Sequence, residues 1–139
     1  MVKRVLMLTF LMALSTLVGC HKRSAKNLVP SQEQAKQALQ IALDSWKANG
    51  KSDQSLSIPN GPTVLAIDTD WRDGKKLQAY EIVGEEPVQA GEPKKFKVKL
   101  TYEGQSPQET IYHVVGNNPL RIFRNEDYKN ATGMGAAEQ

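Results

Sequence analysis

Hydrophobic and polar positions change their spacing along the chain, and each change predicts a different element. An uncharged run covers residues 5–18. Within 32–48, apolar residues recur every three or four positions, which is the spacing of one helix face. From 94 to 103 they alternate with polar residues, which is typical of a strand with one face on a core. The pattern predicts a helix followed by β structure.

The helix is expected from Gln32 to Ala48. Ser31 can cap its start, and Gln34, three residues later, completes a capping box. Asn49 and Gly50 supply a stop signal, since glycine adopts the left-handed conformation after a helix. The apolar stripe consists of Ala35, Ala38, Leu39, Ala42, Leu43 and Trp46. We interpret Trp46 as a core anchor rather than a platform for a ligand.

The second half predicts strands separated by glycine- and proline-containing turns. The candidate strands are 63–68, 76–84, 94–103, 108–115 and 120–124. Within 94–103, Phe96, Val98, Leu100 and Tyr102 alternate with Lys95, Lys97 and Lys99. The lysine row is interpreted as a solvated face, with an anionic docking stripe as the alternative. The predicted fold class is α+β, with one N-terminal amphipathic helix packed on a four- or five-stranded, mostly antiparallel sheet. Its hydrophobic anchors are Trp46, Trp71, Phe96 and Tyr102.

The first twenty residues have the layout of an export signal. Lys3 and Arg4 precede the uncharged run, whose 14 residues are fewer than the roughly 20 that a membrane-spanning helix needs. The run ends in Leu17-Val18-Gly19-Cys20, which resembles the lipobox of bacterial lipoproteins. The resemblance implies cleavage after Gly19, a diacylglyceryl thioether on Cys20 and acylation of the new amino group. The alternatives are an ordinary signal peptide with an incidental cysteine, or an uncleaved anchor.

This interpretation divides the chain into a signal peptide (1–19), a lipidated tether (20–30), an α+β domain (31–128) and a disordered tail (129–139). Without Lys3 and Arg4, 16 basic residues stand against 15 acidic ones, so the mature chain carries a net charge of only +1. Nucleic acid is therefore not an expected partner. The expected partners are a membrane, through the lipid on Cys20, and an unknown envelope protein or small ligand. His21 follows the cysteine where aspartate would resemble an inner-membrane retention signal, which favours the outer membrane, with the domain in the periplasm or on the surface.

Little in the mature chain points to catalysis, a cofactor or a metal. Cys20 is the single cysteine, and His113 is the one candidate base outside the tether. Acidic residues crowd together at 68–73, but Arg72, Asp73 and Ala79 depart from the calcium-loop pattern, so a hydrogen-bonded turn is expected instead. We expect a non-catalytic binding or structural module. If Trp71 is exposed beside this turn, the turn becomes the first candidate contact surface.

One helix followed by antiparallel strands is similar to the cystatin-like and NTF2-like folds. The resemblance rests on element order over 31–127 and implies a helix held against a curved sheet. Cystatin-type protease inhibition is not expected, because Tyr112 stands where the Q-x-V-x-G hairpin has glutamine. The alternative function is a small NTF2-like ligand-binding or enzymatic domain that uses a pocket near His113. Such folds carry many functions, so the resemblance does not choose between them.

Overall fold

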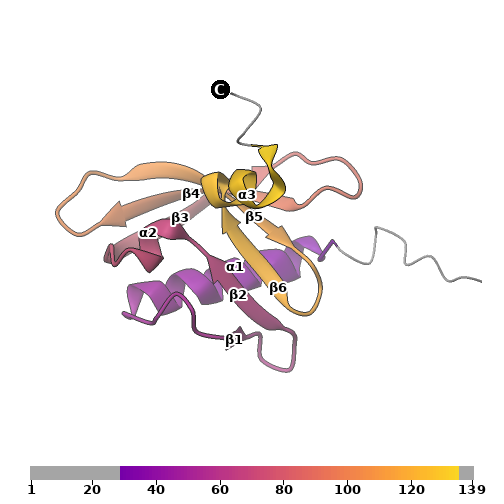
Figure 1. The fold of residues 1–139 in the computed structure, drawn as a ribbon, viewed down its shortest axis with the longest axis horizontal. Helices are drawn as coiled ribbons and strands as arrows, with labels where there is room; N and C mark the ends of the chain where they lie inside the picture. Colours follow the sequence, from indigo (N-terminus) through magenta and orange to yellow (C-terminus); the bar gives the residue numbers. More distant parts are fainter. Residues whose placement is uncertain (1–28, 135–139) are drawn as a thin grey trace, which may run out of the picture.

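The computed structural model describes residues 29–134, and over this range the chain forms a curled six-stranded sheet with three helices. The elements are α1 (Gln32–Lys47), β1 (Leu56–Ser57), β2 (Thr63–Ile67), α2 (Thr69–Arg72), β3 (Leu77–Glu86), β4 (Lys94–Tyr102), β5 (Gln108–Val115), β6 (Leu120–Arg124) and α3 (Asn125–Thr132). The strand order is β1-β2-β6-β5-β4-β3. The pair β2–β6 is parallel and the other pairs are antiparallel. Helix α1 lies across one face of the sheet (Figure 1).

Helix α1 begins and ends close to where its capping residues predict. The Ser31 side chain accepts a hydrogen bond from the Gln34 backbone N–H at 3.2 Å, which confirms the N-cap. After the helix, the left-handed residue is Asn49, with φ 64°, and not Gly50 as expected. Glycine is needed at position 50 for a different reason, because a Cβ there would lie 2.2 Å from the Ser45 Oγ.

The core lies between α1 and the sheet. All six residues of the predicted stripe are buried, and so are the four predicted apolar positions of β4. From β5, β6 and β2, the core receives Tyr112, Val114, Leu120, Ile122 and Val64. Burial of alternate positions on four adjacent strands explains why the period-two pattern is so regular in β4. The helix with its stripe and the β4 alternation are thus confirmed.

The opposite face of the sheet is partly covered by α3, which contacts β5 and β6. His113 of β5 stacks on Tyr128 of α3, with ring centroids 4.1 Å apart, and Phe123 of β6 meets Tyr128 edge-on at 5.8 Å. On α3, Asp127 accepts a hydrogen bond from the Thr69 backbone N–H at 2.9 Å, which ties α3 to α2. The short C-terminal helix therefore closes over the sheet next to α2.

Two features of the predicted architecture are wrong. The sheet has six strands rather than four or five, because β1 has only two residues and carries no periodic signal. Helices α2 and α3 are not predicted. Helix α2 has only four residues and α3 has no buried residue, so neither gives an apolar stripe in the sequence. The sheet is mostly antiparallel, as predicted. Its parallel pair, β2–β6, joins Val64 with Leu120, 56 residues along the chain, and no local pattern encodes this pairing. Because α3 extends to Thr132, the residues 129–132 that were assigned to the tail are helical.

The predicted signal peptide, Cys20, the tether up to residue 28 and residues 135–139 lie outside the described residues. Within 29–134, none of the helices has both the length and the apolar character needed to cross a bilayer.

Candidate functional site

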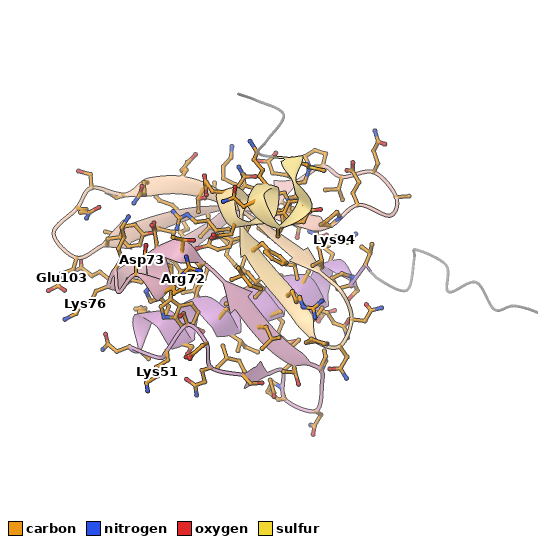
Figure 2. All side chains as sticks on the ribbon, viewed as in Figure 1. Lys51, Arg72, Asp73, Lys76, Lys94 and Glu103 are labelled. Atoms are coloured by element: carbon orange, nitrogen blue, oxygen red, sulfur yellow. The ribbon has the colours of Figure 1, made fainter. Side chains whose placement is uncertain are left out.

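The candidate site is an open groove of about 700 Å³ at the C-terminal end of α1, which we call the tryptophan groove. Its wall comes from the end of α1, the loop that follows it, and the segment from the end of β2 through α2 to the start of β3. The lining residues used below are Trp46, Gly50, Lys51, Asp53, Asp68, Trp71, Arg72, Lys75 and Lys76. Figure 2 shows Lys51, Arg72 and Lys76 on this side of the molecule and Lys94 at the opposite end.

The groove is built on a stacked pair of indoles. Trp46 of α1 and Trp71 of α2 lie with their ring centroids 5.5 Å apart and their planes 10° from parallel. Trp46 Nε1 donates to the Lys75 backbone carbonyl at 2.7 Å, and Trp71 Nε1 donates to the Gly50 backbone carbonyl at 2.8 Å. Because each polar N–H has a partner, both rings can be buried at little cost. Trp71 is only 7% exposed, so it does not provide the exposed tryptophan that would have made the turn the first candidate contact surface.

Behind the tryptophans, Arg124 of β6 pairs with Asp68 and Asp70, and its Nε lies 3.3 Å from Oε2 of the exposed Glu126. Its Nη1 lies 3.0 Å from Asp70 Oδ2 and 3.4 Å from Asp68 Oδ1, and it donates to the Tyr102 hydroxyl at 2.9 Å. The side chains of Arg124 and Asp68 are 10% and 3% exposed. Tyr112 donates its hydroxyl to Asp68. A buried charge is tolerated where it is paired and hydrogen-bonded, and this cluster meets that condition.

The pKa values of Asp68 and Asp70 shift in opposite directions. Burial raises the pKa of Asp68, although the hydrogen bond from Tyr112 and the charge of Arg124 oppose that shift. Burial also acts to raise the pKa of Asp70, but hydrogen bonds from Tyr102 and Lys75 together with Arg124 outweigh it, so the pKa of Asp70 is lowered. Asp70 therefore stays ionised and holds Lys75, whose Nζ lies 3.0 Å away, at the groove wall.

Asp68 also starts α2. Its side chain accepts from the Trp71 backbone N–H at 3.2 Å, the usual geometry of an N-cap. The segment expected to be a hydrogen-bonded turn is thus one turn of helix whose cap belongs to the ion cluster. In the described part of the chain, no three histidine, cysteine or acidic side chains converge in a way that could hold a metal. Asp68 and Asp70 face Arg124 instead.

The rim of the groove is basic. Lys51, Arg72, Lys75 and Lys76 are all exposed, whereas Asp53 is the one exposed acid among the lining residues. The side chains of Lys51 and Lys76 make no hydrogen bond or ion pair with the described residues. Lys75 pairs with Asp70 and Arg72 lies 3.9 Å from Asp73, so Lys51 and Lys76 are the rim cations that are left to attract a ligand with negative charge. The groove therefore offers two unpaired cations at its rim.

His113 lies elsewhere. It does not line the tryptophan groove and is enclosed on the α3 side of the sheet, 5% exposed, with Nε2 2.9 Å from Asn125 Oδ1. The amide oxygen can only accept, so Nε2 carries the proton. Nδ1 is buried without a partner among the described residues, and burial lowers the pKa of the ring. The structure thus gives no support to a concave pocket at His113.

Sequence reasoning found the four aromatic anchors, all of which are buried, but missed Asp68, Asp70 and Arg124 as a cluster. The signal that could have found them is the pair of closely spaced acids before Trp71. Their partner is 56 positions away from Asp68, at the end of β6, and only the fold brings it near. No family model, curated protein or solved structure matches this chain.

Proposed function

We propose that this protein is a lipid-anchored bacterial envelope lipoprotein whose domain is a non-catalytic binding module, with the tryptophan groove as its contact surface. The observation that carries the proposal is the position of the groove. It lies at the C-terminal end of α1, whereas the lipidated tether would join the domain at the N-terminal end, before Gln32. At a rise of 1.5 Å per residue, these ends are about 24 Å apart. A domain held by Cys20 would present the groove away from the anchor.

The length of the tether limits how far the groove can lie from the membrane. Nine residues, Cys20 to Leu28, precede the first described residue and span at most about 30 Å when fully extended. The groove would then operate within a few tens of ångströms of the membrane. A partner of the envelope, either a protein segment or a small ligand with an anionic group, fits the exposed cations Lys51 and Lys76 of the rim, which are unpaired within residues 29–134. A closer relationship to the cystatin-like or NTF2-like folds stays a prediction.

Site-specific photocrosslinking tests this assignment. A photoreactive amino acid at Lys51 probes the rim of the groove, and the same group at Lys94 serves as the matched control at the opposite end of the domain (Figure 2). In cells of the native host type, we expect one defined envelope component to be crosslinked from position 51 and not from 94. In addition, Lys51→Glu combined with Lys76→Glu is expected to remove a product formed by a probe at Ser52. Equal products from both positions, or no effect of the charge reversal, would contradict the proposal.

A further inference from the structure

Strand β3 forms one edge of the sheet, and no other strand within residues 29–134 pairs with its outer side. It has ten residues, pairs with β4 on one side only, and is the last strand in the order β1-β2-β6-β5-β4-β3. The other edge is β1, with two residues. Most of β3 is exposed, and Val83, 47% exposed, is one of two large hydrophobic residues exposed in the described part of the chain. An edge of this kind presents unpaired backbone N–H and C=O groups to another strand.

The side chains of β3 would determine which partner strand can pair with this edge. Glu81 lies opposite Lys99 of β4, and Glu86 lies opposite Lys95, on the face away from α1. On the other face, Tyr80 and Ile82 are half-buried and pack against the core. A strand added beside β3 would therefore meet acids on one face and apolar side chains on the other. The β4 strand, in which lysines alternate with buried apolar residues, shows the chemistry that satisfies both faces.

The same acids act against self-association. Strand β3 contains Glu81, Glu85 and Glu86 but no basic residue. Two copies paired edge to edge would therefore place acidic side chains next to one another, and these would repel. Register shifts between Leu77 and Ala79 and between Ile82 and Gly84 further disturb a long continuous ladder. The section that remains regular, Ala79 to Ile82, is long enough for a short recognition segment.

We infer that the β3 edge is a docking site for an extended partner segment in which basic and apolar residues alternate, added to the sheet as a seventh strand. Main-chain hydrogen bonds would supply the affinity, and Glu81 with Tyr80 and Ile82 would set the specificity. This surface is separate from the tryptophan groove, so the inference does not depend on the function proposed above.

The test uses the full chain in neutral detergent and a nine-residue peptide in which lysine and valine alternate. We expect the peptide to slow amide hydrogen exchange at residues 78–84, and a peptide with glutamate in place of lysine to bind at least about tenfold more weakly. A further peptide carries N-methyl groups at both the lysine and the valine positions. The lysine and valine N–H groups point to opposite edges of a strand, and the direction of the added strand decides which set faces β3, so this fully methylated peptide must fail to bind in either direction.

A matched pair of variants checks the charge argument. Glu81 and Glu109 both lie opposite Lys99, from the edge strand β3 and the interior strand β5 respectively. Glu81→Gln should weaken binding of the basic peptide about two- to fivefold, the range of one cross-strand charge pair, and Glu109→Gln should not. Binding of the fully methylated peptide, or exchange protection elsewhere than β3, would overturn the inference. So would protection of β3 that rises with protein concentration without peptide, because a second copy would then occupy the edge.

Discussion

Trp46 and Trp71 each donate the indole N–H to a backbone carbonyl in the segment that follows the other's helix. Trp46 of α1 bonds to Lys75 after α2, and Trp71 of α2 bonds to Gly50 after α1. The exchange fixes both loops around one stacked pair of rings. The groove is therefore built on buried, hydrogen-bonded core residues rather than on a surface loop alone.

Replacing Trp71 by Phe should show what this exchange contributes. The variant keeps an aromatic ring but leaves the Gly50 carbonyl without its donor, so we expect the free energy of unfolding to fall by about 1–3 kcal/mol. Trp46→Phe should act similarly at Lys75. Because the two rings touch, the double variant should deviate from additivity by about 0.5–1.5 kcal/mol. Urea denaturation of the four proteins measures the coupling, and strict additivity would show that the two contacts act independently.

Arg124 pairs with the buried Asp68 and the half-buried Asp70, and its removal should lower the stability of the fold. Arg124→Met leaves Asp68 buried and unpaired, which we expect to lower the free energy of unfolding by about 3–5 kcal/mol. Arg121→Met is the matched control, since Arg121 lies on the same strand but is exposed, and the expected change is within about 0.5 kcal/mol. Similar losses in the two variants would mean that the cluster is not the source of the stability.

His113 should make stability depend on pH. Burial lowers its folded-state pKa below the ordinary value of 6.5, so its contribution is complete above pH 6.5 and is lost as the pH falls through the folded pKa. The groups that face it are Lys95 of β4 and Asn125, Glu126 and Lys129 of α3. Protonation would add a donor at Nδ1, which has no partner among the described residues.

The control variant is His113→Phe, which can still stack on Tyr128 but cannot titrate. Between about pH 7.5 and pH 5, the wild type should lose stability with a slope of at most about 1.4 kcal/mol per pH unit relative to this variant. Parallel curves for the two proteins in chemical denaturation would refute the assignment to His113.

Gly50 and Gly84 form a second matched pair. A Cβ at Gly50 would meet the Ser45 Oγ at 2.2 Å and the Ser45 carbonyl oxygen at 2.8 Å, whereas at Gly84 nothing lies within 4 Å. Gly50→Ala should therefore lower the midpoint of thermal unfolding, with a loss of about 1–3 kcal/mol. Gly84→Ala should leave the stability unchanged or slightly higher. The reverse order would show that the loop after α1 is not packed as described.

The parts of the fold that sequence predicts are those encoded by neighbours in the chain. The Ser31 cap, the α1 stripe and the β4 alternation are local, and they are confirmed. The parallel pairing of β2 with β6 and the meeting of Asp68 with Arg124 depend on positions more than 50 residues apart, for which no periodic signal exists. The aromatic anchors could be named in advance, but the groove could not, because it arises where two separate stretches of the chain, 46–53 and 66–76, meet.

Intact mass and membrane fractionation of the wild type and of Cys20→Ser, both expressed in a bacterial host of the native type, test whether Cys20 carries the anchor. We expect the wild type to lack residues 1–19, to carry lipid on Cys20 and to fractionate with the membrane. Cys20→Ser should remain unlipidated, as uncleaved precursor or as a chain released from the membrane. A wild type that is soluble and carries no lipid would contradict the account, and Cys20 would then be a free or intermolecular thiol.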